Sequence, residues 1–181
     1  MQGGATQADA VAVGVYPGSF DPLTIAHLAI ADAAVRRLGL GRLDLAISRD
    51  ALGKAHLGEH TVAHRVAAIE RVAVDRPWLA AVVVESRLVA EIAEGYDAVV
   101  MGADKWAQVN DPAWYGGSVA ARDRALAALP RVVVAPRHGL DVPEELRLEV
   151  PGHLAEVSAT EVRRGRSDWA AEPDRYRADP S

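Results

Sequence analysis

Residues 18–27 read Gly18-Ser19-Phe20-Asp21-Pro22-Leu23-Thr24-Ile25-Ala26-His27. The apolar run at residues 11–16 precedes this stretch and the amphipathic residues 28–38 follow it, so the pattern predicts a strand, a tight loop and a helix. Glycine lets a backbone approach a phosphate closely, and the exposed amides at the start of a helix attract anions. His27, at the helix entry, can donate a hydrogen bond to phosphate oxygens as charge builds in a transition state.

Strand and helix patterns alternate along the rest of the chain, with short apolar runs separated by amphipathic stretches. We expect strands at residues 11–16, 43–48, 79–85, 98–101 and 131–135, with weaker candidates at 149–150 and 156–157. We expect helices at residues 26–38, 61–75, 87–94 (capped by Ser86) and 118–129, a short helix from Ser158, and a long loop at 102–117.

This repeated β-α-β order is typical of a parallel sheet that is buried on both faces. Right-handed crossovers then predict a doubly wound α/β sheet, in which ligands lie beyond the carboxyl ends of the strands. A length of 181 residues predicts a single domain. We place this domain at residues 1–165 and a polar C-terminal tail at residues 166–181.

Composition and charge exclude several classes of protein. The net charge of -5 argues against broad capture of nucleic acid, and the absence of cysteine excludes disulfides and thiolate metal sites. No apolar run approaches the roughly 18 residues needed to span a bilayer, and the first nine residues do not resemble a signal peptide. We therefore expect a cytoplasmic protein that binds small molecules rather than nucleic acid or membrane, and the sequence leaves homo-oligomer formation open.

A second candidate anion site is the stretch Val157-Ser158-Ala159-Thr160-Glu161-Val162-Arg163-Arg164. Ser158 and Thr160 place hydroxyls beside the first amides of a helix, and Arg163 lies five residues after Ser158, within reach of the same anion. The alternative is a plain helix start, in which Ser158 caps the first turn and Glu161 completes a capping box.

The segment Met101-Gly102-Ala103-Asp104-Lys105-Trp106 follows the fourth strand. A carboxylate at a strand end, here Asp104, can accept hydrogen bonds from both hydroxyls of a ribose. Tryptophans in a loop are costly to expose, so Trp106 and Trp114 either pack or bind a ligand. Lys54 and Lys105 are the chain's two lysines, and a compact ammonium suits phosphate.

These segments resemble the nucleotidyltransferase superfamily of HxGH and TxGH enzymes. The first signature is G-x-F-D-P, three residues, then G-H; Thr24 stands at the His or Thr position, His27 at the last, and Ala26 replaces the glycine. Residues 157–163 resemble the second signature, I-S-S-T-x-I-R. The G-A-D-K-W run resembles nicotinate and nicotinamide mononucleotide adenylyltransferases.

The resemblance implies a Rossmann-like fold and a role for each matching residue. Thr24 and His27 would contact the α- and β-phosphates of ATP, which Mg²⁺ would accompany, and His27 would stabilise the transition state. The β/γ end would be held by Ser158, Thr160 and Arg163, and the nucleotide by Gly18, Ser19, Phe20 and Asp104. The acceptor would be bound by Lys54, Arg65, Lys105, Trp106 and Trp114.

The resemblance also implies transfer of AMP from ATP to nicotinate or nicotinamide mononucleotide, with release of pyrophosphate, in NAD biosynthesis. Two alternatives stay open. Pantetheine-phosphate adenylyltransferase also uses threonine at the position of Thr24. Ala26, together with the missing first histidine, is also compatible with a homologue that binds nucleotide without catalysing transfer.

Overall fold

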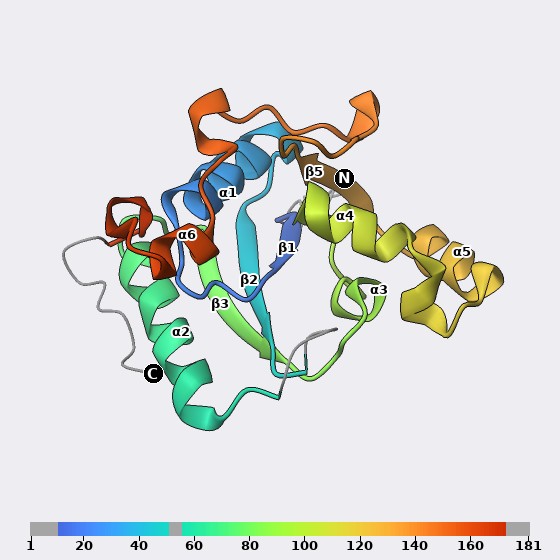
Figure 1. Cartoon of the computed structure of the whole chain (residues 1–181), viewed down its shortest axis with the longest axis horizontal. Coiled ribbons are helices and arrows are strands. Elements are labelled where there is room, and N and C mark those ends of the chain that lie inside the picture. The colour runs from blue at the N-terminus through green and yellow to red at the C-terminus, as the bar shows by residue number, and fades with distance from the viewer. Residues whose placement is uncertain (1–10, 51–55, 173–181) are drawn as a thin grey trace, which may run out of the picture.

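The computed structural model describes residues 11–50 and 56–172, and it confirms the doubly wound parallel sheet (Figure 1). Within these residues the sheet has five strands, all paired in parallel, in the order β3-β2-β1-β4-β5. The strands are β1 (Val13–Pro17), β2 (Arg42–Ser48), β3 (Leu79–Val84), β4 (Ala98–Gly102) and β5 (Arg131–Ala135). The strand order reverses direction beside β1, which places the first signature at the topological switch point.

Helices cover both faces of the sheet. They are α1 (Ile25–Leu38), α2 (Glu59–Ala73), α3 (Val89–Ile92), α4 (Ala103–Asn110), α5 (Val119–Ala127) and α6 (Ala159–Arg163). One apolar cluster joins α1 and α2 to the sheet, and the other joins α3, α4 and α5 to its opposite face. Neighbouring residues of β1 belong to different clusters because successive side chains of a strand point to opposite faces of the sheet. Val15 belongs to the second cluster and Tyr16 to the first.

The expected long loop at residues 102–117 is wrong. Half of it is α4, which is followed by a short 3₁₀ turn at Pro112–Tyr115. Ala103 and Val109 are buried, and Trp106 packs against the same cluster; this spacing of three residues places all three on one face of a helix. Tertiary packing of that face explains a helix that the glycines and proline nearby obscured in the sequence.

Two further predictions of secondary structure are wrong. The helix expected at 87–94 is the shorter α3, and Ser86 does not cap it; the backbone carbonyl of Ser86 instead accepts a hydrogen bond from the Ser48 hydroxyl at 2.7 Å. The segments at 149–150 and 156–157 are not strands, and the chain around them forms 3₁₀ turns. Both segments are too short to add a strand to the sheet without a paired neighbour.

Candidate active site

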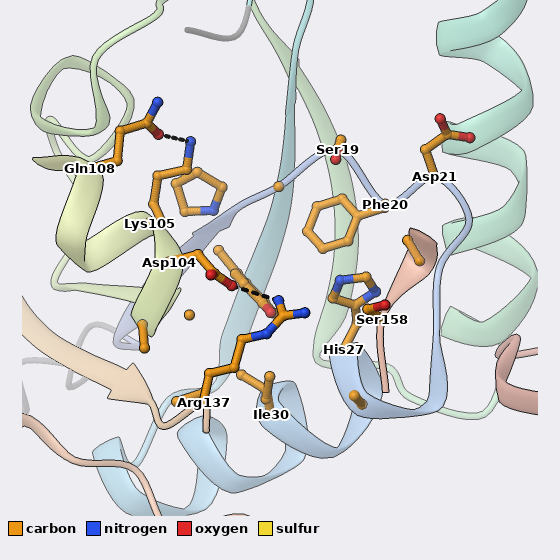
Figure 2. Close-up of a pocket in the computed structure, with 18 of the residues that line it drawn as sticks. Ser19, Phe20, Asp21, His27, Ile30, Asp104, Lys105, Gln108, Arg137 and Ser158 are labelled. Atoms are coloured by element: carbon orange, nitrogen blue, oxygen red, sulfur yellow. Dashed lines mark hydrogen bonds and ion pairs between the residues drawn. The ribbon is translucent and has the colours of Figure 1, made fainter. Parts of the chain in front are cut away.

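A cleft of about 1020 Å³ lies at the carboxyl ends of the strands (Figure 2). It brings together the two predicted signatures, which lie about 130 residues apart in the sequence. In Figure 2, one wall carries Ser19, His27 and Ser158, and the other carries Asp104 and Lys105. Most of the predicted site residues line the cleft: Gly18, Ser19, Phe20, His27, Arg65, Asp104, Lys105, Trp114, Ser158, Thr160 and Arg163.

The loop after β1 is shaped by an aromatic cluster. Phe20 has a positive φ of 45°, a conformation that is rare for a residue with a large side chain. Its ring stands edge-on to the rings of Tyr16 (centroids 5.4 Å apart) and His27 (5.1 Å). A Cβ at Gly18 would lie 2.6 Å from the Phe20 ring, so the loop requires glycine there. This packing keeps the backbone of the loop against the cleft floor.

Thr24 and His27 form a reciprocal capping box at the start of α1. The Thr24 backbone N–H donates to His27 Nδ1 at 3.0 Å, and the His27 backbone N–H donates to Thr24 Oγ1 at 3.3 Å. Because Nδ1 accepts a hydrogen bond, the neutral imidazole carries its proton on Nε2. Thr24 itself is buried and does not line the cleft, whereas His27 does.

Burial keeps His27 neutral: it lowers the pKa of the imidazole from 6.5 to about 4. No acidic side chain occupies the first turn of α1 to compete for its free amides. The site therefore offers a neutral Nε2–H donor and the positive end of a helix to an anion. That combination can stabilise charge on a transferring phosphoryl group without first losing a proton to solvent.

Asp21 connects two arginines from different elements. Arg65 of α2 contacts the Asp21 carboxylate at 2.9 Å and donates to the Ser19 carbonyl at 3.0 Å. Arg163 of α6 donates to the Asp21 backbone carbonyl and lies 3.8 Å from its carboxylate. Burial lowers the pKa of Arg65, and its Nε has no hydrogen-bond partner among the described residues. The structure thus groups Arg65 with Arg163, on the side predicted for the triphosphate.

The start of α6 confirms the predicted helix cap. Ser158 Oγ accepts a hydrogen bond from the Glu161 backbone N–H at 3.2 Å. Thr160 Oγ1 accepts one from Arg163 Nη2, also at 3.2 Å. These contacts orient the hydroxyls and the guanidinium of the second signature along one side of the cleft.

The opposite wall contains residues that sequence reasoning did not select. Arg137, two residues after the end of β5, pairs with Asp104 at 2.6 Å. Gln108 accepts a hydrogen bond from Lys105 Nζ at 2.6 Å (Figure 2). Position alone could have indicated Arg137, because it follows the carboxyl end of a strand. A ribose on Asp104 would share that carboxylate with Arg137.

The predicted tryptophans differ in their surroundings. Trp114 lines the cleft and is partly exposed. Trp106 lies against the apolar cluster behind α4 and is not among the residues that line the cleft. Tyr115 donates its hydroxyl to the Val109 carbonyl at 3.0 Å. Lys54 lies outside the described residues, so its predicted role stays a prediction.

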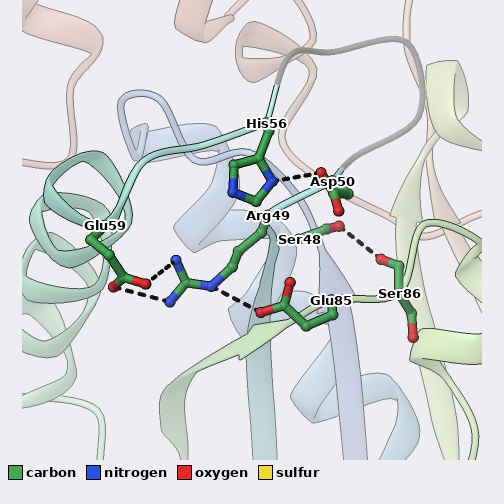
Figure 3. A network of polar contacts seen from close by, with 7 residues as sticks. All are labelled: Ser48, Arg49, Asp50, His56, Glu59, Glu85 and Ser86. Atoms are coloured by element: carbon green, nitrogen blue, oxygen red, sulfur yellow. Dashed lines mark hydrogen bonds and ion pairs between the residues drawn. The ribbon is translucent and has the colours of Figure 1, made fainter.

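A polar network lies at the carboxyl ends of β2 and β3 (Figure 3). Arg49 bridges Glu59 (2.9 Å) and Glu85 (3.0 Å), while Asp50 contacts His56 at 2.7 Å. The hydrogen bond from His56 lowers the pKa of Asp50. Arg87, which also lines the cleft, lies 3.9 Å from the Asp50 carboxylate and was not selected from the sequence.

The described residues contain no group of three histidines, cysteines or carboxylates arranged to hold a metal ion. Within the same residues, no helix has the length and apolar character needed to cross a bilayer.

A model of the cytidylyltransferase-like family matches residues 15–165. The chain belongs to the cytidylyltransferase-like family. It is accordingly a nucleotidyltransferase, as the two signatures predicted, and the matched residues span both of them. A search of curated proteins finds no match.

Solved structures of a Plasmodium falciparum enzyme share the fold. Nicotinic acid mononucleotide adenylyltransferase complexed with NaAD superposes with a TM-score of 0.57, and the same enzyme complexed with APC with 0.58. In each case the identity is 14%, and the match covers 86% of this chain and 83% of the other. At this identity the likeness establishes the fold of the nucleotidyltransferase, and the substrate must be argued from the cleft.

Proposed function

We propose that this nucleotidyltransferase transfers AMP from ATP to the phosphate of nicotinate or nicotinamide mononucleotide and releases pyrophosphate. The observation that carries the proposal is the neutral His27 at the start of α1, facing the same cleft as Ser158 and Arg163. The fold of the Plasmodium enzyme, whose name states the nicotinic acid mononucleotide acceptor, supports the choice of substrate.

The transfer needs no covalent enzyme intermediate. An oxygen of the acceptor phosphate forms a bond to the α-phosphorus of ATP, the bond from that phosphorus to the bridging oxygen breaks, and pyrophosphate leaves with the bonding electrons. The residues supply position and charge rather than a nucleophile. His27 Nε2–H donates to the α/β-phosphate oxygens, and Arg163 holds the departing pyrophosphate.

In this proposal ATP contacts both walls of the cleft, and the acceptor lies against the wall that carries Trp114 and Lys105. Ser158, Thr160 and Arg163 hold the β- and γ-phosphates, while Gly18, Ser19 and Phe20 line the nucleoside. On the opposite wall, Asp104 receives the ribose of ATP. Trp114 stacks on the pyridine ring of the acceptor, and Lys105 adds positive charge near it.

Mg²⁺ enters this scheme as a companion of ATP. The described residues offer no three-ligand cluster for it, which fits an ion bound chiefly by phosphate oxygens and water. When bound there, it would neutralise part of the triphosphate charge. Asp21 and Asp104, the carboxylates nearest the proposed phosphates and ribose, are both already paired with arginine.

Thr24 favours a second acceptor, phosphopantetheine, because pantetheine-phosphate adenylyltransferases carry threonine at this signature position. The capping box found here is compatible with either acceptor. Trp114 in the cleft favours a flat aromatic acceptor over the flexible pantetheine chain.

The test is pyrophosphate release by the purified full chain with Mg²⁺ and either ATP or CTP, each combined with nicotinate mononucleotide, nicotinamide mononucleotide or phosphopantetheine. We expect release with ATP and one pyridine mononucleotide, and a dinucleotide product of matching mass. Pyrophosphate release only with CTP would mean that CTP, not ATP, is the donor. Release only with phosphopantetheine would mean that it, not a pyridine mononucleotide, is the acceptor. If no pair of substrates gave pyrophosphate release although the chain still bound ATP, the proposal would be contradicted.

His27→Ala is the matched control for the chemistry. Removing one preorganised donor lowers kcat by about 10²–10³-fold, while ATP affinity stays within a few-fold. A second control, His64→Ala, removes a histidine of α2 that does not line the cleft, and should leave turnover unchanged. Turnover that survives His27→Ala would contradict the catalytic assignment.

A further inference from the structure

The chain beyond Gly165 returns to the first signature. Ala170 pairs with Thr24 in an isolated antiparallel bridge, and the Ala171 N–H donates to the Leu23 carbonyl at 2.9 Å. Ala170 and Thr24 are 2% and 1% exposed, so water does not reach this contact. Residues predicted as a polar tail therefore contact the loop that leads into α1, the helix of His27. Figure 1 shows this last coloured segment beside α6 and α2.

Both ends of residues 166–172, which we call the C-terminal strap, are anchored. At one end the Arg166 backbone N–H donates to the Glu161 carbonyl of α6 at 3.0 Å. At the other end Glu172 pairs with Arg71 of α2 at 2.8 Å. Between them the Arg166 guanidinium lies 3.9 Å from the centre of the Trp169 ring. The strap thus runs from the second signature to α2 and passes the first signature on the way.

The strap contacts Thr24, the residue that fixes the tautomer of the His27 imidazole. The Thr24 backbone N–H fixes the imidazole tautomer by donating to Nδ1, and its Oγ1 accepts from the His27 backbone. A shift of Thr24 would therefore move or release the ring. Because the bridge partner is buried backbone, it restrains Thr24 in a way that surface side chains do not.

We propose that the C-terminal strap positions His27 for transfer by holding Leu23 and Thr24 through backbone contacts. Ala171 and Glu172 are positioning residues in this arrangement, since neither touches the cleft. The inference deepens the proposed function of the same site and rests on it for its kinetic consequence. Its structural consequence, the tautomer and pKa of His27, is independent of which acceptor the enzyme uses.

The first test is Ala171→Pro, which removes the N–H that donates to Leu23, with Ala171→Ser as a matched control that keeps it. We expect Ala171→Pro to lower kcat by about 10-fold and to leave KM for ATP within about 2-fold, because orientation rather than binding is lost. Ala171→Ser should behave as the natural chain. Equal kcat for both variants would overturn the inference.

The second test reads His27 directly in the full chain without substrate. Nitrogen-detected NMR of the imidazole should show the Nε2–H tautomer in the natural chain, and in Ala171→Pro a mixture of tautomers with a pKa moved toward 6.5. An unchanged His27 spectrum in a folded Ala171→Pro protein would overturn the inference. If the natural chain were inactive with every acceptor, this spectrum would still decide the strap's role, while the proposed function would fail separately.

A third variant keeps the inference testable if Ala171→Pro does not fold. Glu172→Gln preserves length and removes the charge that pairs with Arg71. We expect a smaller fall in kcat, about 3-fold, with the same separation of kcat from KM. A rise in KM for ATP with unchanged kcat would contradict a positioning role.

Discussion

Two carboxylates, Asp44 and Asp21, both pair with arginine, but Asp44 lies within the sheet and Asp21 lies in the loop between β1 and α1. Asp44 lies within β2, is 4% exposed, and accepts hydrogen bonds from Arg42 Nε at 2.6 Å and from the Tyr96 hydroxyl at 2.9 Å. The Asp21 side chain lies near the carboxyl ends of the strands and is 48% exposed. Its carboxylate is shared by Arg65 and Arg163.

The difference lies in how completely the charges are satisfied. Around Asp44, two partners supply three hydrogen bonds to one buried carboxylate, and burial together with that contact raises the pKa of Tyr96 to about 12. Around Asp21, two guanidiniums share one carboxylate, and Arg65 Nε is left without a hydrogen bond among the described residues. The first arrangement is complete without a ligand, whereas the second has positive charge in excess, ready for an anion.

The largest expected effect is on stability, at the Asp44 cluster. Arg42→Ala would leave the Asp44 carboxylate buried with only Tyr96, and we expect the free energy of unfolding to fall by about 2–3 kcal/mol. Urea unfolding followed by circular dichroism measures it. Asp44→Asn in the same background should restore part of the loss by removing the charge. An unchanged free energy of unfolding in Arg42→Ala would contradict the proposed difference between Asp44, whose charge its partners satisfy, and Asp21.

A matched pair of tryptophans extends the comparison to the other wall. Trp114→Ala should raise KM for the pyridine mononucleotide by about 10-fold with little effect on melting temperature, because it removes a stacking surface in the cleft. Trp106→Ala should do the reverse, since Trp106 packs against the core cluster. Steady-state kinetics and thermal melting of both variants decide it. A stability loss for Trp114→Ala without a KM change would place it in the core.

Asp21→Asn tests whether the carboxylate competes with the triphosphate for the arginines. We expect Kd for ATP to fall by about 3-fold at low salt, because Arg163 then presents its full charge to phosphate. Titration calorimetry with ATP at two salt concentrations checks the sign. Weaker ATP binding in Asp21→Asn would mean that Asp21 chiefly orients the arginines, as Asp44 orients its own partners.

The last prediction concerns pH. His27 has a pKa of about 4 in the folded chain against 6.5 as a free side chain, so the unfolded chain binds more protons between these values. The contribution of His27 to stability is therefore complete above pH 6.5 and is lost as the pH falls toward 4. Unfolding free energies measured from pH 7 to 4 should show this slope in the natural chain and not in His27→Gln. An NMR titration of His27 near pH 6.5 would contradict it.

Much of the fold was predictable from local pattern. The five strands begin and end within two residues of their expected limits. Short apolar runs separated by amphipathic stretches, and the glycine or proline residues at their boundaries, are local signals. Ser158 caps its helix as expected. Helix α4 was missed because its apolar spacing lies among residues typical of loops, and only burial against the sheet distinguishes it.

The candidate site divides in the same way. By itself the sequence determined the chemistry of the two signatures, since residue type and spacing place hydroxyls, an imidazole and an arginine at helix starts. Tertiary structure alone decided that Arg65 and Arg163 share Asp21, that Arg137 faces Asp104, and that Trp114 rather than Trp106 lines the cleft. It also decided that the C-terminal strap holds Thr24. The physical reason is that these contacts join residues distant along the chain, and their distances depend on strand order and on the path of the returning chain, which no local pattern encodes.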